Sequence, residues 1–573
     1  MLGKKWNSGF SIAAQALLIY VWLTDLSALA GTDTHYSVYL LLGVAALLCL
    51  WDNRKGGKSR PALWCLAGLF SVAVVLGNHE IYEPASLQNR LNFVMDLLGG
   101  FCVGYQILFC MLRRLPLRRD TGQRKHPQWV FWGVFAAVAL IDLGFLLARY
   151  PGILTRDSIT TVSQVVFGSY DNTMPYYHTR LVGLFVKLGL ALTGDINVGI
   201  ALFHGFQIGL LATAFACVIA TLYQIGVPGW ALGLVLFVYA LLPYNIVYSV
   251  TLWKDVPFGA SALLLAVAFY RLVKNVAGKW DYAAFALGAV GMALMRTNGW
   301  AALLIAAVLL AVVLRKQNRL LVKVLLAVLV LSWVMIGPVL KSMNVPGTDP
   351  VEAFAVPMQQ IARVVAEGRE LTGEETQLLS EIFLLDKLGQ VYNPLTVDPV
   401  KFETFRYDQV ALIRENLGQY LKLYVNLGLR YPADYAKPWI DETKGYWNGG
   451  YFFWIYTKGV GSSAYGLEAS YGNNFVASAF AALFRYVEKL SILQPLTSIG
   501  LYVWATLGCF LVNALKKREE ALLTIPILVL VVGLWLGTPV YAEFRYAYPF
   551  FVTIPLLLGA TCFQQEKRKG QNA

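Results

Sequence analysis

The sequence predicts an all-α polytopic membrane protein, with about 14 transmembrane helices and a mostly helical domain outside the membrane. Of its 573 residues, 57% are hydrophobic and only 14% are charged, and the mean hydropathy is +0.56. A soluble globular protein does not need so apolar a composition. The apolar residues also come in runs of about 17–22, the length an α-helix needs to cross a bilayer.

These apolar runs follow one another along most of the chain. They lie at 10–30, 36–51, 61–77, 93–112, 129–149, 198–223, 231–248, 258–273, 281–296, 299–314, 320–340, 497–514, 521–538 and 549–563. Basic residues fall in every second loop between them, and the loop 224–229 is the one neutral exception. By the positive-inside rule these basic loops, and both termini, are expected to be cytoplasmic. The segments 150–197 and 341–496 are then extracytoplasmic.

The spans and loops divide the chain into four predicted regions. They are accessory transmembrane helices at 1–128, a transmembrane core at 129–340 with its first outer loop at 150–197, an extracytoplasmic domain at 341–496, and C-terminal helices with a basic tail at 497–573. The first run is taken as a retained anchor, because residues 1–6 form no clear cleavable signal. The seven cysteines lie in or beside apolar runs, so we expect neither disulfides nor a cysteine metal site.

Two stretches of the outer loop have helical character, 158–167 and 179–192, and the second is apolar enough to lie along the membrane interface. In the segment 341–496, Thr372 followed by Glu375 forms a capping-box pattern that predicts the start of a soluble helix. Asp142 lies inside the run 129–149. It can hydrogen-bond a neighbouring helix, or it can hold a proton or an ion.

Polar and charged residues gather at the outer ends of the predicted spans. They are Asp157, His178, Arg180, Lys254, Asp255, Arg296, Asn298, Glu543 and Arg545. Each one alone can be a helix end whose side chain reaches the headgroups. Their shared placement on one side of the membrane instead favours a single site, in which Asp157 is the catalytic residue and the others bind substrate.

One carboxylate with several cations is suited to moving a sugar from a lipid-linked phosphate. Asp157 would take the proton of the accepting hydroxyl. Lys254, Arg296 and Arg545 would hold the charge that grows on the phosphate leaving group. A glycoside hydrolase would need two facing carboxyl groups instead.

Structural roles remain open for the same residues. Asp157 can be the N-cap of a helix over 158–167. Lys254 can pair with its neighbour Asp255, and Arg545 can pair with Glu543. Arg296 has no acidic residue three or four positions away in its own helix, so an anionic partner is expected from elsewhere.

An acid just past a helix, followed by His178, resembles the first outer loop of the GT-C membrane glycosyltransferases, especially the protein O-mannosyltransferases. Those enzymes carry an Asp-Glu pair and a His-Pro pair there, whereas here Ser158 follows Asp157 and Thr179 follows His178. Further motifs resemble a family of Gram-positive multispan proteins related to GT-C enzymes. They are Trp253-Lys254-Asp255, Pro357 to Arg363 with Gln359 and Gln360, Gly445-Tyr446-Trp447 and Arg545-Tyr546, and the resemblance covers roughly 129–563. It implies a GT-C-like core and an inverting glycosyltransferase.

The leading hypothesis is therefore an enzyme of the cell membrane that uses a polyprenyl-phosphate-linked sugar at the outer leaflet. Its acceptor would be a cell-envelope glycan or a lipid. The alternatives are a flippase or transporter of lipid-linked glycans, and a surface polysaccharide polymerase or ligase. The chain has no internal repeat of the kind many transporters show. No cofactor is predicted, although a divalent metal is left open. The net charge of +13 comes from topology signals, so no nucleic acid partner is expected.

Overall fold

Helices form almost all of the regular structure in the computed structural model, which confirms the all-α fold class. The structure describes residues 9–30, 35–84, 86–119, 124–274, 276–314, 318–347, 351, 354–452, 455, 464–468, 474–538 and 540–565. The only named strands among these residues are β1 (Leu117–Arg119) and β2 (Phe563–Gln565), which pair in parallel.

Eight helices in the described part of the chain are long and apolar enough to cross a membrane, or ten if each of two bent helix pairs counts as one span. Many large apolar side chains on these helices face outward, including Leu140 (70% exposed) and Leu147 (72%). The same holds for Val312 (63%), which lies on a shorter apolar helix. Such an apolar exterior suits a lipid environment. The protein is thus a multipass membrane protein, while the predicted number of fourteen spans is not confirmed. Three predicted spans, at 61–77, 281–296 and 299–314, correspond to apolar helices shorter than 18 residues.

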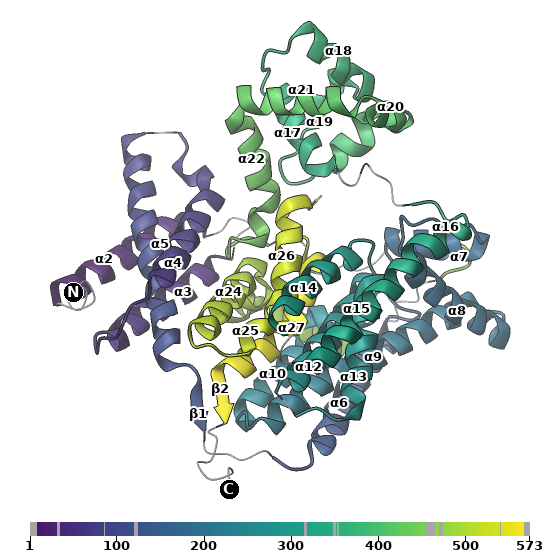
Figure 1. Ribbon diagram of the computed structural model, residues 1–573, viewed down its shortest axis with the longest axis horizontal. Coiled ribbons are helices and arrows are strands. Elements are labelled where there is room, and N and C mark those ends of the chain that lie inside the picture. The colour runs from purple at the N-terminus through teal and green to yellow at the C-terminus, as the bar shows by residue number, and fades with distance from the viewer. Residues whose placement is uncertain are drawn as a thin grey trace.

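The N-terminal helices form a bundle of their own. It consists of α2 (Gly9–Leu26), α3 (Tyr36–Asn53), α4 (Pro61–Gly77) and α5 (Leu87–Arg114), with short 3-10 turns η1 (Ser27–Leu29) and η2 (His79–Tyr82). Its core includes Trp22 and Tyr39, whose rings meet edge to face at 5.8 Å. Figure 1 shows this bundle in purple and blue to one side of the other helices. It contacts them through α24, which packs against α4 and α5.

The central helices pack around α12 (Asp255–Val273), which is buried over most of its length. It contacts α9 (Ile196–Gln224), α13 (Lys279–Leu294) and α27 (Phe544–Cys562). The remaining central helices are α6 (Pro127–Ala148), α10 (Gly229–Leu241), α11 (Pro243–Ser249), α14 (Gly299–Leu314), α15 (Arg319–Val334), η3 (Met335–Val339), α16 (Leu340–Ser342), α24 (Ile499–Leu515), α25 (Glu520–Leu523) and α26 (Ile525–Gly537). The late-sequence helices α24–α27 lie between the N-terminal bundle and the teal helices α9–α15 (Figure 1).

A small residue allows a close helix contact in this core. A Cβ atom added to Gly288 of α13 would lie 2.7 Å from the backbone nitrogen of Leu265 and 2.9 Å from the carbonyl oxygen of Ser261, both in α12. The two backbones can therefore approach this closely only with glycine at position 288. Close packing through small residues is a usual way for membrane helices to associate, because lipid leaves little hydrophobic force between them.

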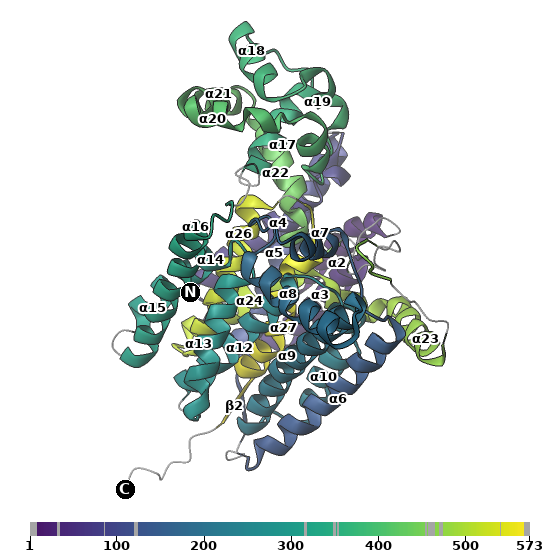
Figure 2. The same cartoon turned by 90° about the vertical axis from the view of Figure 1, so that its right-hand side faces the viewer.

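A separate helical body stands at one end of the molecule. It contains α17 (Ala355–Ala366), α18 (Gly373–Ile382), α19 (Leu385–Val391), η5 (Val400–Thr404), η6 (Tyr407–Gln409), α20 (Val410–Glu415), α21 (Leu417–Arg430) and α22 (Pro432–Thr443). It has its own apolar core, and the predicted capping box forms at Thr372 and Glu375. Figure 2 shows this α17–α22 body at the opposite end of the molecule from β2. The α22 helix leads back into the central helices through η7 (Lys444–Tyr446).

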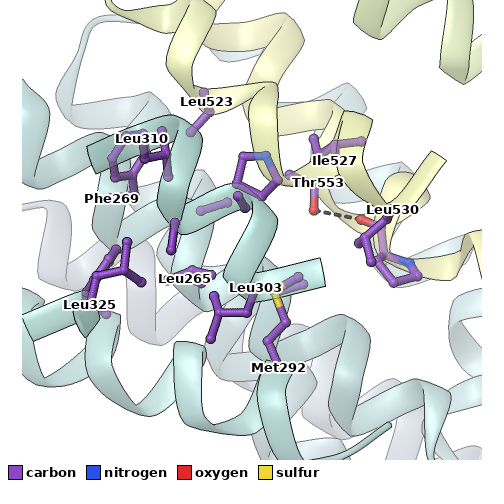
Figure 3. Close-up of a pocket in the computed structure, with 17 residues that line it drawn as sticks. Leu265, Phe269, Met292, Leu303, Leu310, Leu325, Leu523, Ile527, Leu530 and Thr553 are labelled. Atoms are coloured by element: carbon purple, nitrogen blue, oxygen red, sulfur yellow. Dashed lines mark hydrogen bonds between the residues drawn. The ribbon is translucent and has the colours of Figure 1, made fainter. Parts of the chain in front are cut away.

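A small apolar cavity lies among α12, α13, α14, α15, α26 and α27 (Figure 3). Its volume is about 20 Å³, and its lining includes Leu265, Phe269, Leu303 and Ile527. The hydroxyl of Thr553 at its edge donates to the carbonyl of Pro549 in its own helix, at 2.7 Å. A space of this size holds no more than about one water molecule and offers no free polar group, so it is a packing gap and not a substrate site.

Candidate functional site

Three segments far apart in the sequence bring their charged residues together. Asp157 lies at the start of α7 (Arg156–Phe167), and Lys254 directly precedes α12. Arg545 lies in the first turn of α27. The Nζ atom of Lys254 lies 3.3 Å from Asp157 Oδ2, and Arg545 Nη1 lies 2.8 Å from the same oxygen. One carboxylate thus bridges two cations.

The backbone around Asp157 is fixed to the segment that carries Lys254. Ile153 pairs with Thr251 as a parallel bridge, and Ser158 donates its hydroxyl to the carbonyl of Leu252 at 2.9 Å. The indole of Trp253 donates to Thr155 Oγ1, also at 2.9 Å. These bonds hold Asp157 and Lys254 in register, so their contact does not depend on two flexible side chains alone.

The N-cap interpretation of Asp157 is wrong. The N-cap of α7 is Thr155, whose hydroxyl accepts from the backbone N–H of Ser158, while the Ser158 hydroxyl accepts from the N–H of Thr155. Asp157 lies inside the first turn, with its carboxylate left for Lys254 and Arg545. The helix itself agrees with the predicted stretch 158–167, and α8 (Tyr176–Thr193) agrees with the stretch 179–192.

Electrostatics keeps Asp157 ionised. Burial by itself would raise the pKa of this carboxyl, but the neighbouring Lys254 and Arg545 outweigh burial and hold the pKa below its ordinary value. At neutral pH the group is therefore a carboxylate with low basicity. A ligand that drew the two cations away would make Asp157 a stronger base.

Glu543 is the second acid of the cluster. Its Oε1 lies 3.0 Å from Arg545 Nε, so Arg545 joins both acids. Burial raises the pKa of Glu543 to about 7, the negative charges of Asp255 and Asp157 add to this rise, and Arg545 opposes it. The sequence predicted the pairing of Glu543 with Arg545. It gave no sign that Glu543 would titrate near neutral pH, because that depends on burial.

Arg296 and Asp255 form a neighbouring pair. Arg296 Nη1 lies 2.8 Å from an oxygen of Asp255, a residue with no solvent exposure. The guanidinium also lies over the ring of Tyr546, 4.9 Å from its centre. The sequence left the partner of Arg296 open because Asp255 belongs to another helix. Lys254 pairs with Asp157, and no ion pair between Lys254 and Asp255 is found among the described residues.

The other predicted binding residues lie differently. His178 is buried, and neither ring nitrogen has a hydrogen-bond partner among the described residues. Burial, and secondarily the charge of Lys254, lowers the pKa of His178 to about 3, so the ring is neutral. Arg180 is exposed and lies 5.1 Å above the ring of Tyr170. Asn298 is exposed beside the start of α14. No hydrogen bond or ion pair joins Arg180 or Asn298 to Asp157 among the described residues.

The η7 turn, which follows the α17–α22 body, contacts the cluster through Tyr446. The Tyr446 hydroxyl accepts from the backbone N–H of Glu543 at 2.9 Å and donates to the carbonyl of Val540 at 2.8 Å. Gly445 packs against Ala542, where an added Cβ would lie 2.3 Å from the Ala542 Cβ. The backbone that leads into Glu543 and Arg545 is thus held from outside α27. The supporting role of these two residues could not be predicted from their motif.

Only one group of His, Asp or Glu ligand atoms in the described part of the chain is close enough to hold a metal, namely His79, Glu80 and Asp441. Lys444 Nζ lies 2.7 Å from Glu80 and 3.2 Å from Asp441. An ammonium group therefore already neutralises this group. The Asp157 cluster offers cations and no such ligand set.

Together, the fold and the cluster define a multipass helical membrane protein with a charged site where its core meets the α17–α22 body. The chain belongs to the family of unknown function DUF6020, whose sequence model matches residues 170–573. No curated protein and no solved structure matches this chain. The family match includes Lys254, Arg296, Glu543 and Arg545, and it begins after Asp157.

Proposed function

We propose that this protein is an inverting membrane glycosyltransferase of the GT-C type, which takes a sugar from a polyprenyl-phosphate-linked donor at the outer leaflet. The acceptor is a cell-envelope glycan or a lipid-linked glycan. The observation that carries the proposal is the position of Asp157 between Lys254 and Arg545. A base and two phosphate-binding cations are thereby within reach of one reacting centre.

In the proposed reaction the acceptor hydroxyl oxygen forms a bond to the anomeric carbon of the sugar. The bond from that carbon to the phosphate oxygen breaks, and the polyprenyl phosphate leaves with the electron pair. Asp157 takes the proton of the acceptor hydroxyl. Lys254 and Arg545 stabilise the negative charge that develops on the leaving phosphate, which already leaves readily and needs no acid.

The ion pairs of Asp157 support an order of events in this proposal. An arriving phosphate competes with Asp157 for Lys254 and Arg545. As the two cations turn to the phosphate, the influence that lowers the pKa of Asp157 weakens. The carboxylate therefore becomes a better base only when the donor is present. Arg296 adds positive charge beside the cluster, and Asp255 fixes its position.

The test is a donor panel with the purified full-length chain in detergent. Polyprenyl-phosphate sugars are incubated with candidate acceptors, and released polyprenyl phosphate is measured. Nucleotide sugars run beside them. Release from at least one lipid-linked donor, and none from nucleotide sugars, is expected. Turnover of nucleotide sugars alone would exclude the lipid-donor assignment.

A flippase for lipid-linked glycans is the second candidate, and one observation favours it. Asp142 is 3% exposed inside α6, a helix long enough to span the membrane. Buried acids in spans often serve ion or proton pathways. Proteoliposomes that contain the purified chain distinguish the two, because a flippase moves a labelled lipid-linked glycan between leaflets without releasing polyprenyl phosphate. A surface polysaccharide polymerase or ligase would instead share the transfer chemistry and show itself by a polymeric product.

A further inference from the structure

A polar cavity lies at one end of the N-terminal bundle, outside the residues that match the family. It is formed where α2 and η1 meet η2 and α5, and its volume is about 300 Å³. Its polar lining consists of Thr24, Asp25, Ser27, Tyr82, Asn92 and Asp96. No Lys, Arg or His is among the residues described as lining it.

Asp96 is the buried member of this lining. It has no solvent exposure, and its Oδ2 accepts from the hydroxyl of Tyr82 at 2.7 Å. Its Oδ1 has no hydrogen-bond partner among the described residues. A buried carboxylate with an unsatisfied oxygen is costly unless something positive or hydrogen-donating reaches it. The second carboxylate, Asp25, lines the same cavity and adds negative charge.

The hydroxyl groups around the cavity are oriented as acceptors. Thr24 donates its hydrogen to the carbonyl of Val21, and Ser27 donates to the carbonyl of Thr24. Tyr82 donates to Asp96. With their hydrogens used in this way, these oxygens present lone pairs to anything inside the cavity. Apart from the amide N–H₂ of Asn92, the polar side chains of the lining thus present acceptors, so the cavity favours a ligand with positive charge or with N–H and O–H donors.

The neighbouring His79, Glu80 and Asp441 group shows the opposite arrangement. There, Lys444 of the protein supplies the positive charge, at 2.7 Å from Glu80. At the cavity no described side chain does so. We infer that the cavity binds a small cation through oxygen atoms alone. Oxygen donors of this kind suit a hydrated Ca²⁺ or Mg²⁺ ion, and they also suit the ammonium group of a small organic amine.

The location gives the cation a structural effect. Tyr82 of η2 reaches the cavity, and His79 at the other end of η2 lies 3.0 Å from Asp441 of α22. A cation at Asp96 would hold η2 in place beside its contact with the α17–α22 body. Binding should therefore stabilise the folded chain as a whole.

The test measures the thermal unfolding midpoint of the purified full-length chain in nanodiscs. CaCl₂, MgCl₂ and ethanolamine hydrochloride are each added, and tetramethylammonium chloride at equal ionic strength is the control because it has no N–H donor. The variants are Asp96→Asn and Asp25→Asn. Glu80→Gln is the matched control, since it removes a carboxylate from η2, the turn that also carries Tyr82, but from the group that Lys444 neutralises.

At least one of the three salts should raise the wild-type midpoint by about 2 °C or more over the control salt. A response to CaCl₂ or MgCl₂ identifies a metal ion, and a response to ethanolamine alone identifies an amine. The shift should persist in Glu80→Gln and vanish in Asp96→Asn. The affinity of Asp96→Asn for the same cation, measured by equilibrium dialysis, should be lowered more than about tenfold.

Three results would overturn the inference. They are no salt-specific shift in the wild type, a shift in both Asp variants as large as that of the wild type, and a shift that only Glu80→Gln abolishes. The last result would place the cation at the His79 group. If Asp96→Asn does not fold, Asp25→Asn decides the matter, because Asp25 is only partly buried and its loss leaves the Tyr82 bond intact.

Discussion

The two acidic sites of this protein use the same residue types in opposite settings. In the Asp157 cluster, two cations lie within 3.3 Å of one carboxylate, and a third basic residue lies nearby in an ion pair of its own. In the cavity of the N-terminal bundle, Asp25 and Asp96 lie among hydroxyl groups without a described cation. Where cations already pair with an acid, an incoming anion can compete with that acid for the cations. An acid without them attracts a cation instead, so the partners decide which ligand each site suits.

The largest expected effect comes from Asp157→Asn. This change keeps the shape of the side chain and removes its basicity, so turnover with a lipid-linked donor should fall by roughly 10²–10⁴. Steady-state release of polyprenyl phosphate measures this. Asp171→Asn, a change in the same outer loop at an acid that accepts from Gln164 and Thr173, should keep wild-type activity. Near-normal turnover in Asp157→Asn would remove the base from the mechanism.

The next largest effect is expected from Arg545→Gln and Arg296→Gln. Charge on the leaving phosphate grows in the transition state, so kcat should fall by about 10²–10³ while KM changes less. A soluble short-chain donor allows both constants to be measured. Arg180→Gln serves as the control because Arg180 is exposed and stacked on Tyr170. A change confined to KM would mean that these residues bind only the ground state.

Lys254 should show a smaller and graded effect. Lys254→Ala should lower kcat/KM for the donor by about 10–10², and Lys254→Arg should recover part of the loss. The recovery is partial because a planar guanidinium binds phosphate differently from a compact ammonium. If the Ala variant kept the donor efficiency of the wild type, Lys254 would serve only as the structural partner of Asp157.

Glu543 should make stability depend on pH. Its folded-state pKa of about 7 lies above the ordinary value near 4.3, so the folded protein binds the proton more tightly than the unfolded chain. Its contribution is therefore full below about pH 4.3 and is lost as the pH rises through 7, by roughly 2–4 kcal/mol. Asp157, with a lowered pKa, titrates below this window and adds no slope within it.

The measurement compares unfolding midpoints of wild type and Glu543→Gln between pH 5 and 8. The wild type should lose stability relative to the variant as pH rises. Parallel curves would mean that Glu543 is ionised throughout this range.

The smallest effect is expected from Tyr446→Phe. It removes the hydroxyl bonds to Glu543 and Val540 and keeps the ring, so we expect a loss of about 1–2 kcal/mol in stability. Donor turnover should change by less than about tenfold, with the pH profile shifted if Glu543 moves. Thermal unfolding and a pH–rate series test both points, and an unchanged variant would make Tyr446 a packing residue only.

Much of the fold follows from the sequence because apolar runs and helix length are local properties. Even so, the length of 16 residues in both α13 and α14, and the 49° bend between α10 and α11, do not appear in a hydropathy pattern. The outer-loop helices and the Thr372 capping box were predicted correctly from local signals. The count of fourteen spans exceeds what the structure supports.

The site was less predictable because its contacts join distant segments. The sequence placed Asp157, Lys254, Arg296 and Arg545 on one side, but not their pairing. Asp255 could not be assigned to Arg296, since Asp255 begins α12 and Arg296 lies in the turn between α13 and α14. Arg180 and Asn298 were also predicted at the outer ends of spans, but neither forms an ion pair or hydrogen bond with Asp157 among the described residues. The roles of all these residues, and the enzyme activity itself, stay predictions. The Asp25 and Asp96 cavity has no motif at all, because its residues are adjacent only after the bundle folds.

The pairing of Asp157 with Arg545 also has a consequence for biosynthesis. The two residues are 388 positions apart, so at about 5–20 residues per second the ribosome adds Arg545 roughly 20–80 s after Asp157. During that interval the growing chain holds Asp157 without its nearer cation. The cluster is completed only when α27 packs into the core, so a chain that stops short of α27 would sit in the membrane without Arg545 beside Asp157.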